Sequence, residues 1–313
     1  MRAIWWLAAA GSNSLRTRSV WRNSAEAALA RALVFVLEYA SRPVADALGS
    51  GCAGLLDLLV PRLRQTAYTN LTFAFPDRDA AWRRSTVDGV YRSIGRLIVA
   101  FARFPLINQS NVAAWIRYEG FEHYEQAKER GKGVLFATAH LGNWELSAFA
   151  HALLTEKMSI VVRPLDNPLV DELVETRRAL SGNTLLSKRD FARSMLHALR
   201  DNEPVGILVD QNSAGDNAAF VPFFGKLACT NLTFAKLAAR SEAAVIPGFA
   251  VWSEKERRYV LRFYPALTMT GDAVDDTARI QSAVEAAIRE CPEQWLWIHR
   301  RWKTRPEGEP GIY

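Results

Sequence analysis

The sequence is poor in cysteine: its 313 residues include only Cys52, Cys229 and Cys291. Their number is odd and they lie far apart, which fits neither a disulfide framework nor the short ligand spacings of a zinc cluster. Structural disulfides accumulate in oxidising compartments, so their scarcity favours a reducing environment that faces the cytosol.

Long apolar runs are also missing. A transmembrane helix needs about 18 or more apolar residues in succession. The segment 29–60 is rich in Leu, Val and Ala, but charged side chains interrupt it at Arg31, Glu38, Arg42, Asp46 and Asp57. The pattern predicts amphipathic helices, the first of them capped by Ser24. Such helices either belong to the core or lie in a membrane interface with Trp5, Trp6 and Trp21.

Several motifs of common enzyme classes do not occur. The sequence has no G-x-x-x-x-G-K-[ST] loop, no G-x-G-x-x-G turn and no G-x-S-x-G elbow. His140, Glu145 and His151 fit neither H-E-x-x-H nor H-x-x-E-H, which argues against a zinc hydrolase. The sequence therefore offers no obvious nucleophile of its own, and any base that it supplies would suit activation of a substrate hydroxyl.

Basic residues exceed acidic ones, 39 against 33, and the resulting net charge of +6 favours an anionic partner. Two segments concentrate this charge. A helix predicted over about 80–104 carries arginines on one face, at Arg83, Arg84, Arg92, Arg96 and Arg103. The tail 295–306 combines tryptophans with Arg300, Arg301, Lys303 and Arg305. Each is either a solvated face or a contact surface for an anion. No nucleic-acid-binding module accompanies the charge, so no nucleic-acid partner is expected.

From about residue 116 onward, short apolar runs alternate with helical patterns. Buried strands are predicted at 133–140, 158–163, 204–210 and 243–251, with a candidate edge strand at 260–268. Helices are predicted near 143–153, 168–181, 190–200 and 231–240, and a last helix runs from about Asp275 to Pro292. This alternation predicts an α/β fold with a mostly parallel central sheet flanked by helices.

The most informative segment is HLGNWE, residues 140–145. His140 falls where a strand ends, Gly142 permits a tight turn, and Asn143 is a suitable cap for the next helix. Glu145 lies in the first turn of that helix. Ligands of open α/β sheets bind beyond the carboxyl ends of the strands. A histidine paired there with a carboxylate is suited to general-base catalysis, so His140 and Glu145 are the candidate catalytic pair.

Two further strand ends supply polar residues to the same edge of the sheet. Arg163 closes the strand at 158–163 and suits a phosphate or a developing oxyanion. Asp210 and Gln211 close the strand at 204–210. We take Arg163, Asp210, Gln211 and Asn143 as candidate substrate-binding residues.

These segments resemble the lipid A biosynthesis acyltransferases, a family within the lysophospholipid acyltransferase superfamily. The resemblance rests on HLGNWE and on further blocks in the family's order: NLTFAFPD (70–77), RPLDNP (163–168), DQN (210–212), VPFFGKLACT (221–230), LAARSEAAVIP (237–247) and WLWIHRRWKTRP (295–306). It implies a glycerol-3-phosphate acyltransferase-like fold, with a membrane-associating helical region over 1–110 and an α/β core over 111–313.

The resemblance also implies a function. A fatty acyl chain would pass from acyl carrier protein, or from acyl-CoA, to a hydroxyl of a membrane glycolipid at the cytoplasmic face of the inner membrane. His140 would be the base and Glu145 its partner, and no metal or cofactor is required. Two alternatives remain: a phosphatidylinositol mannoside or other lysophospholipid as acceptor, and a catalytically silent membrane-binding protein of the same fold.

Overall fold

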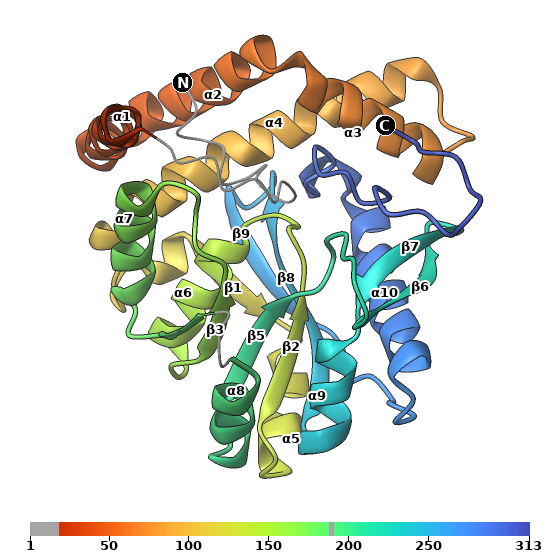
Figure 1. Ribbon diagram of the computed structural model, residues 1–313. Coiled ribbons are helices and arrows are strands. Elements are labelled where there is room, and N and C mark those ends of the chain that lie inside the picture. Colours follow the sequence, from red (N-terminus) through yellow and green to blue (C-terminus); the bar gives the residue numbers. More distant parts are fainter. Residues whose placement is uncertain (1–18, 188–190) are drawn as a thin grey trace.

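A seven-stranded sheet forms the centre of the computed structural model, which describes residues 19–187 and 191–313 (Figure 1). Its strands are β1 (Ile116–Glu119), β2 (Val134–Thr138), β3 (Ser159–Val162), β4 (Thr184–Ser187), β5 (Pro204–Leu208), β8 (Ala244–Ser253) and β9 (Arg258–Phe263). They lie in the order β1-β9-β8-β2-β5-β3-β4. Five of them, from β8 to β4, are mutually parallel, whereas β9 and β1 run the opposite way. The predicted α/β fold is confirmed.

Helices cover both faces of this sheet. One face packs against α5 (Phe121–Glu129), α6 (Trp144–Leu154) and α7 (Pro168–Ala179). The other packs against α8 (Phe191–Arg200), α9 (Thr233–Ser241) and α10 (Ala273–Glu290). A separate hairpin is formed by β6 (Ala218–Phe223) and β7 (Lys226–Asn231). Strands covered on both faces read as continuous apolar runs, which is why the sequence identified the central ones.

The sequence interpretation was wrong or incomplete at the periphery. The strand predicted at 260–268 is β9, which begins earlier and lies between β1 and β8 rather than at an edge. The true edge strand β1 was missed because its sequence, IRYE, is short and only half-buried. β4, α5 and the β6–β7 hairpin were missed for the same reason, since short elements carry little periodic signal.

Four helices form a layer across one end of the sheet (Figure 1). They are α1 (Val20–Tyr39), α2 (Arg42–Leu59), α3 (Pro61–Ala74) and α4 (Ala80–Ala102). The cap of α1 is Ser19, whose hydroxyl accepts a hydrogen bond from the Arg22 amide, and not Ser24 as predicted. Ser24 lies within the helix. The proposed interfacial tryptophans Trp5 and Trp6 lie outside the described residues, and the division at about residue 110 stays a prediction.

Over residues 19–187 and 191–313, no single helix has the length and apolar character needed to cross a membrane. α2 and α3 meet that test only as a pair, and their axes bend by 88° where they join.

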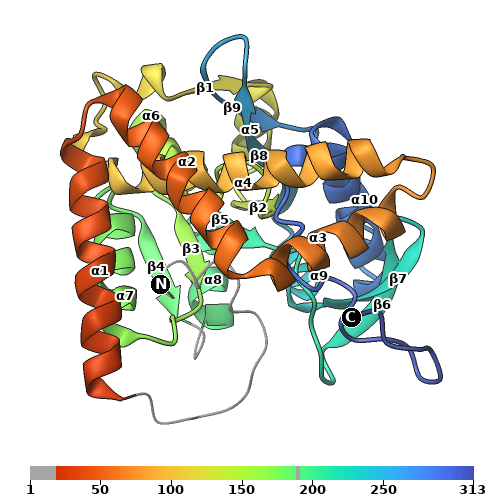
Figure 2. The same ribbon diagram turned by 90° about the horizontal axis from the view of Figure 1, so that it is seen from above.

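α2 and α4 cross at a pair of glycines (Figure 2). A Cβ atom added to Gly49 would lie 2.4 Å from Val99 Cγ2 and 2.9 Å from the Gly95 carbonyl oxygen. A Cβ on Gly95 would lie 2.9 Å from the Gly49 carbonyl oxygen. The two backbones therefore touch. Val90, Ile94 and Leu97 of α4 belong to the same apolar cluster as Leu141 in the loop after β2, which connects the crossing to that loop.

We expect Gly49→Ala to destabilise the protein by about 1–3 kcal/mol, because the added methyl group has no room at the crossing. Gly51→Ala is the matched control: a Cβ there meets nothing within 4 Å. Since alanine favours helix more than glycine does, the control should be neutral or stabilise by up to about 1 kcal/mol. Urea unfolding of both variants measures the difference, and equal stabilities would contradict the glycine crossing.

Candidate active site

The loop after β2 presents His140 at the carboxyl end of the central strands. Gly142 adopts a φ of +65°, and a Cβ atom there would lie 2.0 Å from the carbonyl oxygen of Ala250. That same carbonyl accepts a hydrogen bond of 2.8 Å from the Asn143 amide. The Asn143 side chain then caps α6 by accepting from the Leu146 amide at 2.9 Å. A side chain at position 142 would push the loop away from β8, so glycine is required for this geometry.

The His140 imidazole is held by Asp210. Nδ1 of His140 lies 2.8 Å from Oδ1 of Asp210, and the backbone amide of His140 donates to Oδ2 at 2.9 Å. The indole of Trp295 donates to the same Oδ2 at 2.7 Å. Asp210 is 1% exposed, whereas the His140 side chain is 15% exposed. The carboxylate is therefore sealed from water while one edge of the imidazole stays accessible.

The charge state of Asp210 fixes the tautomer of His140. Burial by itself raises the pKa of Asp210, but the charge of His140 and hydrogen bonds from His140 and Trp295 outweigh it and lower the pKa to about 2. An ionised carboxylate only accepts hydrogen bonds, so Nδ1 of His140 carries the hydrogen. In neutral imidazole the lone pair is then on Nε2. That nitrogen faces the Gln211 amide nitrogen at 3.2 Å, which donates to it.

A second imidazole beside the site stays neutral. Burial, together with the neighbouring charge of His140, lowers the pKa of His299 to about 3. Its Nε2 accepts a hydrogen bond of 3.0 Å from the Asn212 amide. His299 therefore shapes the loop that carries Asp210 and Gln211, and does not compete with His140 for a proton.

Glu145 pairs with an arginine of α7 and not with His140, the partner that the sequence predicted. Its two oxygens bind Arg178 of α7 at 2.5 and 2.8 Å, and both side chains are largely buried. The carboxylate that contacts the His140 ring is that of Asp210, so the expected direct pairing of His140 with Glu145 was wrong. A first-turn side chain of α6 points along the face that meets α7, whereas Asp210 approaches from the neighbouring strand β5. A catalytic role for Glu145 itself stays a prediction.

The remaining predicted substrate-binding residues, Gln211, Asn143 and Arg163, have different positions in the site. Gln211 contacts His140 directly. Asn143 is fully buried, and its side-chain oxygen caps α6, so it positions the loop. Arg163 follows β3 at the predicted edge and is exposed. The arginine that lines the adjoining pocket is Arg178.

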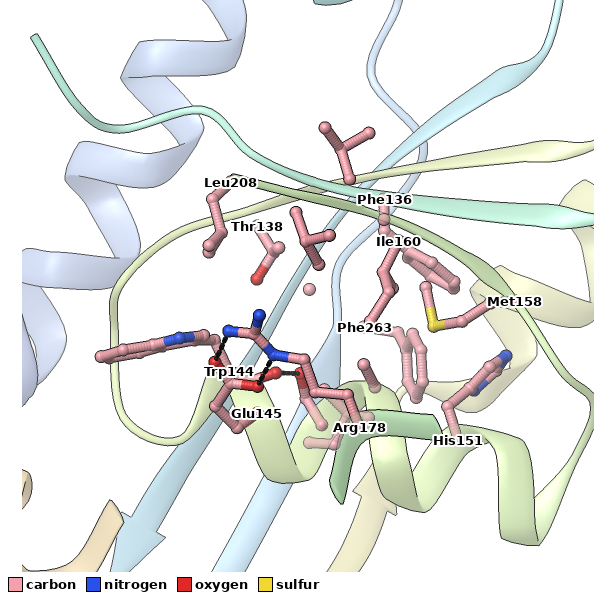
Figure 3. A pocket seen from close by; sticks show the side chains of 17 residues that line it. Phe136, Thr138, Trp144, Glu145, His151, Met158, Ile160, Arg178, Leu208 and Phe263 are labelled. Carbon is pink, nitrogen blue, oxygen red and sulfur yellow. Dashed lines mark hydrogen bonds and ion pairs between the residues drawn. The ribbon is translucent and has the colours of Figure 1, made fainter. Parts of the chain in front are cut away.

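An apolar pocket lies between the sheet and α6 (Figure 3). One of its lining residues is Trp144, whose ring lies 4.8 Å from that of His140. Thr138 and Leu208 line the same part of the pocket, beside the Glu145–Arg178 pair. Further along β2 and β5, away from their carboxyl ends, it is lined by side chains that are almost all apolar or aromatic: Phe136, His151, Met158, Ile160 and Phe263, together with Gly206. Burial lowers the pKa of His151 to about 4, so its imidazole adds no charge there near neutral pH.

The two basic segments are largely occupied in holding the fold. Arg83 and Arg103 donate to backbone carbonyls, and Arg96 pairs with Glu254. In the tail, Arg301 is fully buried and donates to the Cys229 carbonyl. Arg84 and Arg92 remain exposed.

Within the part of the chain that the structure describes, no cluster of three or more His, Cys, Asp or Glu side chains could hold a metal ion.

Sequence reasoning missed two residues that complete the site. Trp295 donates to Asp210 from a segment that is distant in the chain, and Arg178 lies in the last turn of α7. One signal was available for each: the tail is unusually rich in tryptophan, and a glutamate on a buried helix turn requires a cationic partner. Neither signal is enough to predict which residue Trp295 or Glu145 contacts.

In this α/β fold, a histidine held by a buried aspartate thus lies beside an apolar pocket. The profile of the bacterial lipid A biosynthesis acyltransferase family matches residues 10–304 of the chain. The chain therefore belongs to that family, and the protein is an acyltransferase.

Curated relatives agree over most of the chain. A lipid A biosynthesis lauroyltransferase of Escherichia coli K12 is 30% identical over 284 residues, which are 90% of this chain and 91% of that protein. A palmitoleoyltransferase of lipid A biosynthesis from the same organism is 30% identical over 276 residues, 87% of this chain and 89% of that protein. A lipid A biosynthesis acyltransferase of Haemophilus influenzae is 27% identical over 248 residues, 79% of this chain and 77% of that protein.

We expect His140→Ala to reduce acyl transfer by about 10²–10⁴-fold, the usual contribution of a general base. Asp210→Asn should cost nearly as much, because an amide cannot hold the ring in the required tautomer. The loss of activity in the double variant should be far smaller than the two single losses combined, because the two residues act as a unit. The measurement is turnover per folded molecule for each variant. Near-normal turnover in folded His140→Ala protein would exclude His140 as the general base.

A separate experiment assigns the role of Glu145. Arg178→Met leaves a buried, unpaired carboxylate and should destabilise the protein by about 3–5 kcal/mol. Glu145→Leu combined with Arg178→Met should recover most of that stability, because the uncompensated charge is gone. If the stable double variant is active, the pair is structural. If it is folded but inactive, Glu145 or Arg178 acts on the substrate.

Proposed function

We propose that the protein transfers a fatty acyl chain from a thioester donor to a hydroxyl group of a lipid A precursor. The observation that carries this proposal is the accessible imidazole of His140 beside an apolar pocket: its ring lies 4.8 Å from that of Trp144, which lines the pocket. Family membership and the printed functions of the relatives support lipid A biosynthesis as the context.

The proposed reaction begins when the acceptor hydroxyl replaces the Gln211 amide at Nε2 of His140. His140 takes the hydroxyl proton as the oxygen attacks the thioester carbonyl carbon, so an O–H bond breaks and a C–O bond forms. The ionised Asp210 stabilises the imidazolium. When the tetrahedral intermediate collapses, the C–S bond breaks, and the imidazolium returns its proton to the departing sulfur. A thiol leaves readily, so the step needs no covalent acyl-enzyme.

The developing oxyanion needs hydrogen-bond donors near the carboxyl ends of β2, β5 and β3. Arg163 and the backbone amides of the loops at this edge are the proposed donors. Arg163 supports this role by its exposure, which leaves its guanidinium accessible to a substrate.

We propose acyl carrier protein as the donor and acyl-CoA as the alternative. Carrier proteins of this type are acidic, and the exposed Arg84 supplies a cation for the encounter. We further propose that the protein acts at the cytoplasmic face of the inner membrane, attached peripherally or through its N-terminal region. Large apolar side chains exposed on α1 and α2 support membrane contact.

The acyl chain would occupy the apolar pocket. The side chains leave about 80 Å³ free there, roughly half of the cavity of about 150 Å³ that admits benzene in another protein. Long chains therefore require the lining to move. Met158 is suited to this because its thioether side chain is unbranched and flexible.

The direct test incubates the purified protein with a lipid A precursor and either acyl carrier protein thioesters or acyl-CoA, and follows the acceptor by mass spectrometry. An acceptor heavier by one acyl group supports the proposal, and the donor that supports turnover settles the choice of thioester. No transfer from either donor to the precursor, combined with transfer to a lysophospholipid or a phosphatidylinositol mannoside, would overturn the proposed acceptor.

We expect Gly206→Ala to shift the enzyme toward shorter acyl chains. A Cβ atom at Gly206 would lie 2.7 Å from Met158 Cε, so the methyl group and the displaced thioether take space at the inner part of the pocket. Gly311→Ala is the control, because a Cβ there meets nothing within 4 Å. Competition between donors of different chain length measures the preference, and an unchanged preference would exclude this pocket as the acyl site.

A further inference from the structure

A second, polar cavity of about 430 Å³ lies between α2, α4 and the β8–β9 hairpin, and it shares no lining residue with the apolar pocket. Four arginines line it: Arg42 from α2, Arg92 and Arg96 from α4, and Arg257 from the hairpin. The carboxylates that pair with these arginines are Asp46 and Glu254. Four guanidinium groups against two carboxylates leave a net charge of about +2 among these groups. The mechanism above uses none of these residues.

Aromatic rings hold two of these guanidinium groups in place. Arg42 stacks 4.1 Å from the centroid of the Trp115 ring, and Arg96 stacks 4.8 Å from that of Trp252. Stacking positions a guanidinium group without neutralising its charge or using up its N–H donors. The first residue of α2 is Arg42, and the preceding Ser41 makes no capping hydrogen bond, so the positive end of this helix adds to the field. The cavity is therefore arranged to receive an anion with several oxygens, such as a phosphate.

Apolar side chains are exposed on α2, which lines the cavity, and on the adjoining α1. Large side chains on α1 and α2 are between 40% and 76% exposed, namely Phe35, Tyr39, Val44, Leu48, Leu55 and Leu58. α2 thus presents Arg42 and Asp46 to the cavity and, from the same turns, Val44 and Leu48 to the surroundings. A phospholipid has this combination, an anionic phosphate joined to an apolar tail. A protein partner would require a broad charged surface instead of a recessed cavity beside apolar side chains.

We propose that this arginine cavity binds the phosphate group of an anionic membrane phospholipid, while the exposed apolar side chains of α1 and α2 enter its acyl layer. The inference rests on the membrane contact included in the proposed function. It adds a headgroup site that is distinct from the catalytic one. Lipid binding there would orient the protein with the helical layer toward the bilayer.

The test uses the full chain and vesicles of phosphatidylglycerol mixed with phosphatidylcholine, compared with vesicles of phosphatidylcholine alone. The cavity variant is Arg92→Gln combined with Arg257→Gln, because both side chains are exposed and so their loss leaves the core intact. The charge-matched control is Arg84→Gln combined with Arg240→Gln, two exposed arginines that do not line the cavity. Thermal melting verifies that both variants fold.

Loss of two headgroup contacts should weaken binding to the anionic vesicles by about 10–30-fold in the cavity variant, and by less than about threefold in the control. Binding to phosphatidylcholine vesicles should stay the same in all three proteins. Calorimetry with dihexanoyl phosphatidylglycerol, a soluble lipid, should show saturable binding that the cavity variant loses and the control keeps.

Equal weakening in cavity variant and control would overturn the proposal, since it would indicate diffuse surface charge. So would unchanged vesicle binding combined with a raised KM for acyl carrier protein, which would assign the cavity to the donor. Acyl transfer to a detergent-dispersed acceptor should be normal in the cavity variant. If the wild type itself fails to transfer, the proposed function fails while the vesicle result still decides the lipid site.

Discussion

The buried carboxylate of Asp210 is the constraint around which the site is built. An ion with 1% exposure is stable only if its oxygens are fully bonded. Here the bonds come from the amide and the ring of His140 and from the Trp295 indole. One side chain therefore joins the ends of β2 and β5 to the C-terminal tail. The same bonds that satisfy the charge also set the orientation of the His140 ring, so the stability of the fold and the geometry of the proposed base have a common origin.

The layer of N-terminal helices completes this arrangement from outside the sheet. α4 packs on the loop that carries His140, and Asn70 of α3 donates to the carbonyls of Trp297 and His299 in the tail. The region that the sequence suggested as a membrane attachment thus also supports the catalytic loop. We expect a perturbation of α2 to reach the loop of His140 through the glycine crossing and the apolar side chains of α4, without touching any polar residue of the site.

Much of the fold could be predicted because buried parallel strands appear in the sequence as continuous apolar runs. The position of His140 followed from the same logic, since a strand end in an open sheet is where ligands bind. The partners of the charged residues could not be predicted. Glu145 lies five residues from His140 but pairs with Arg178, whereas Asp210, seventy residues away, contacts the ring. These pairings depend on which strand lies next to β2 and on the facing of α6 and α7, and that is tertiary information that no local pattern contains.

The walls of the apolar pocket come mainly from strands, and this has an evolutionary consequence. Gly206 belongs to β5, which is hydrogen-bonded to a neighbour on either side, so its backbone cannot retreat from a new methyl group. Only the tip of Met158 can yield. In such a pocket one nucleotide change, from a glycine to an alanine codon, adds a volume close to that of one carbon unit of a ligand. If the pocket holds the acyl chain as proposed, single substitutions in its strand walls would change the accepted chain length in steps of about one carbon unit.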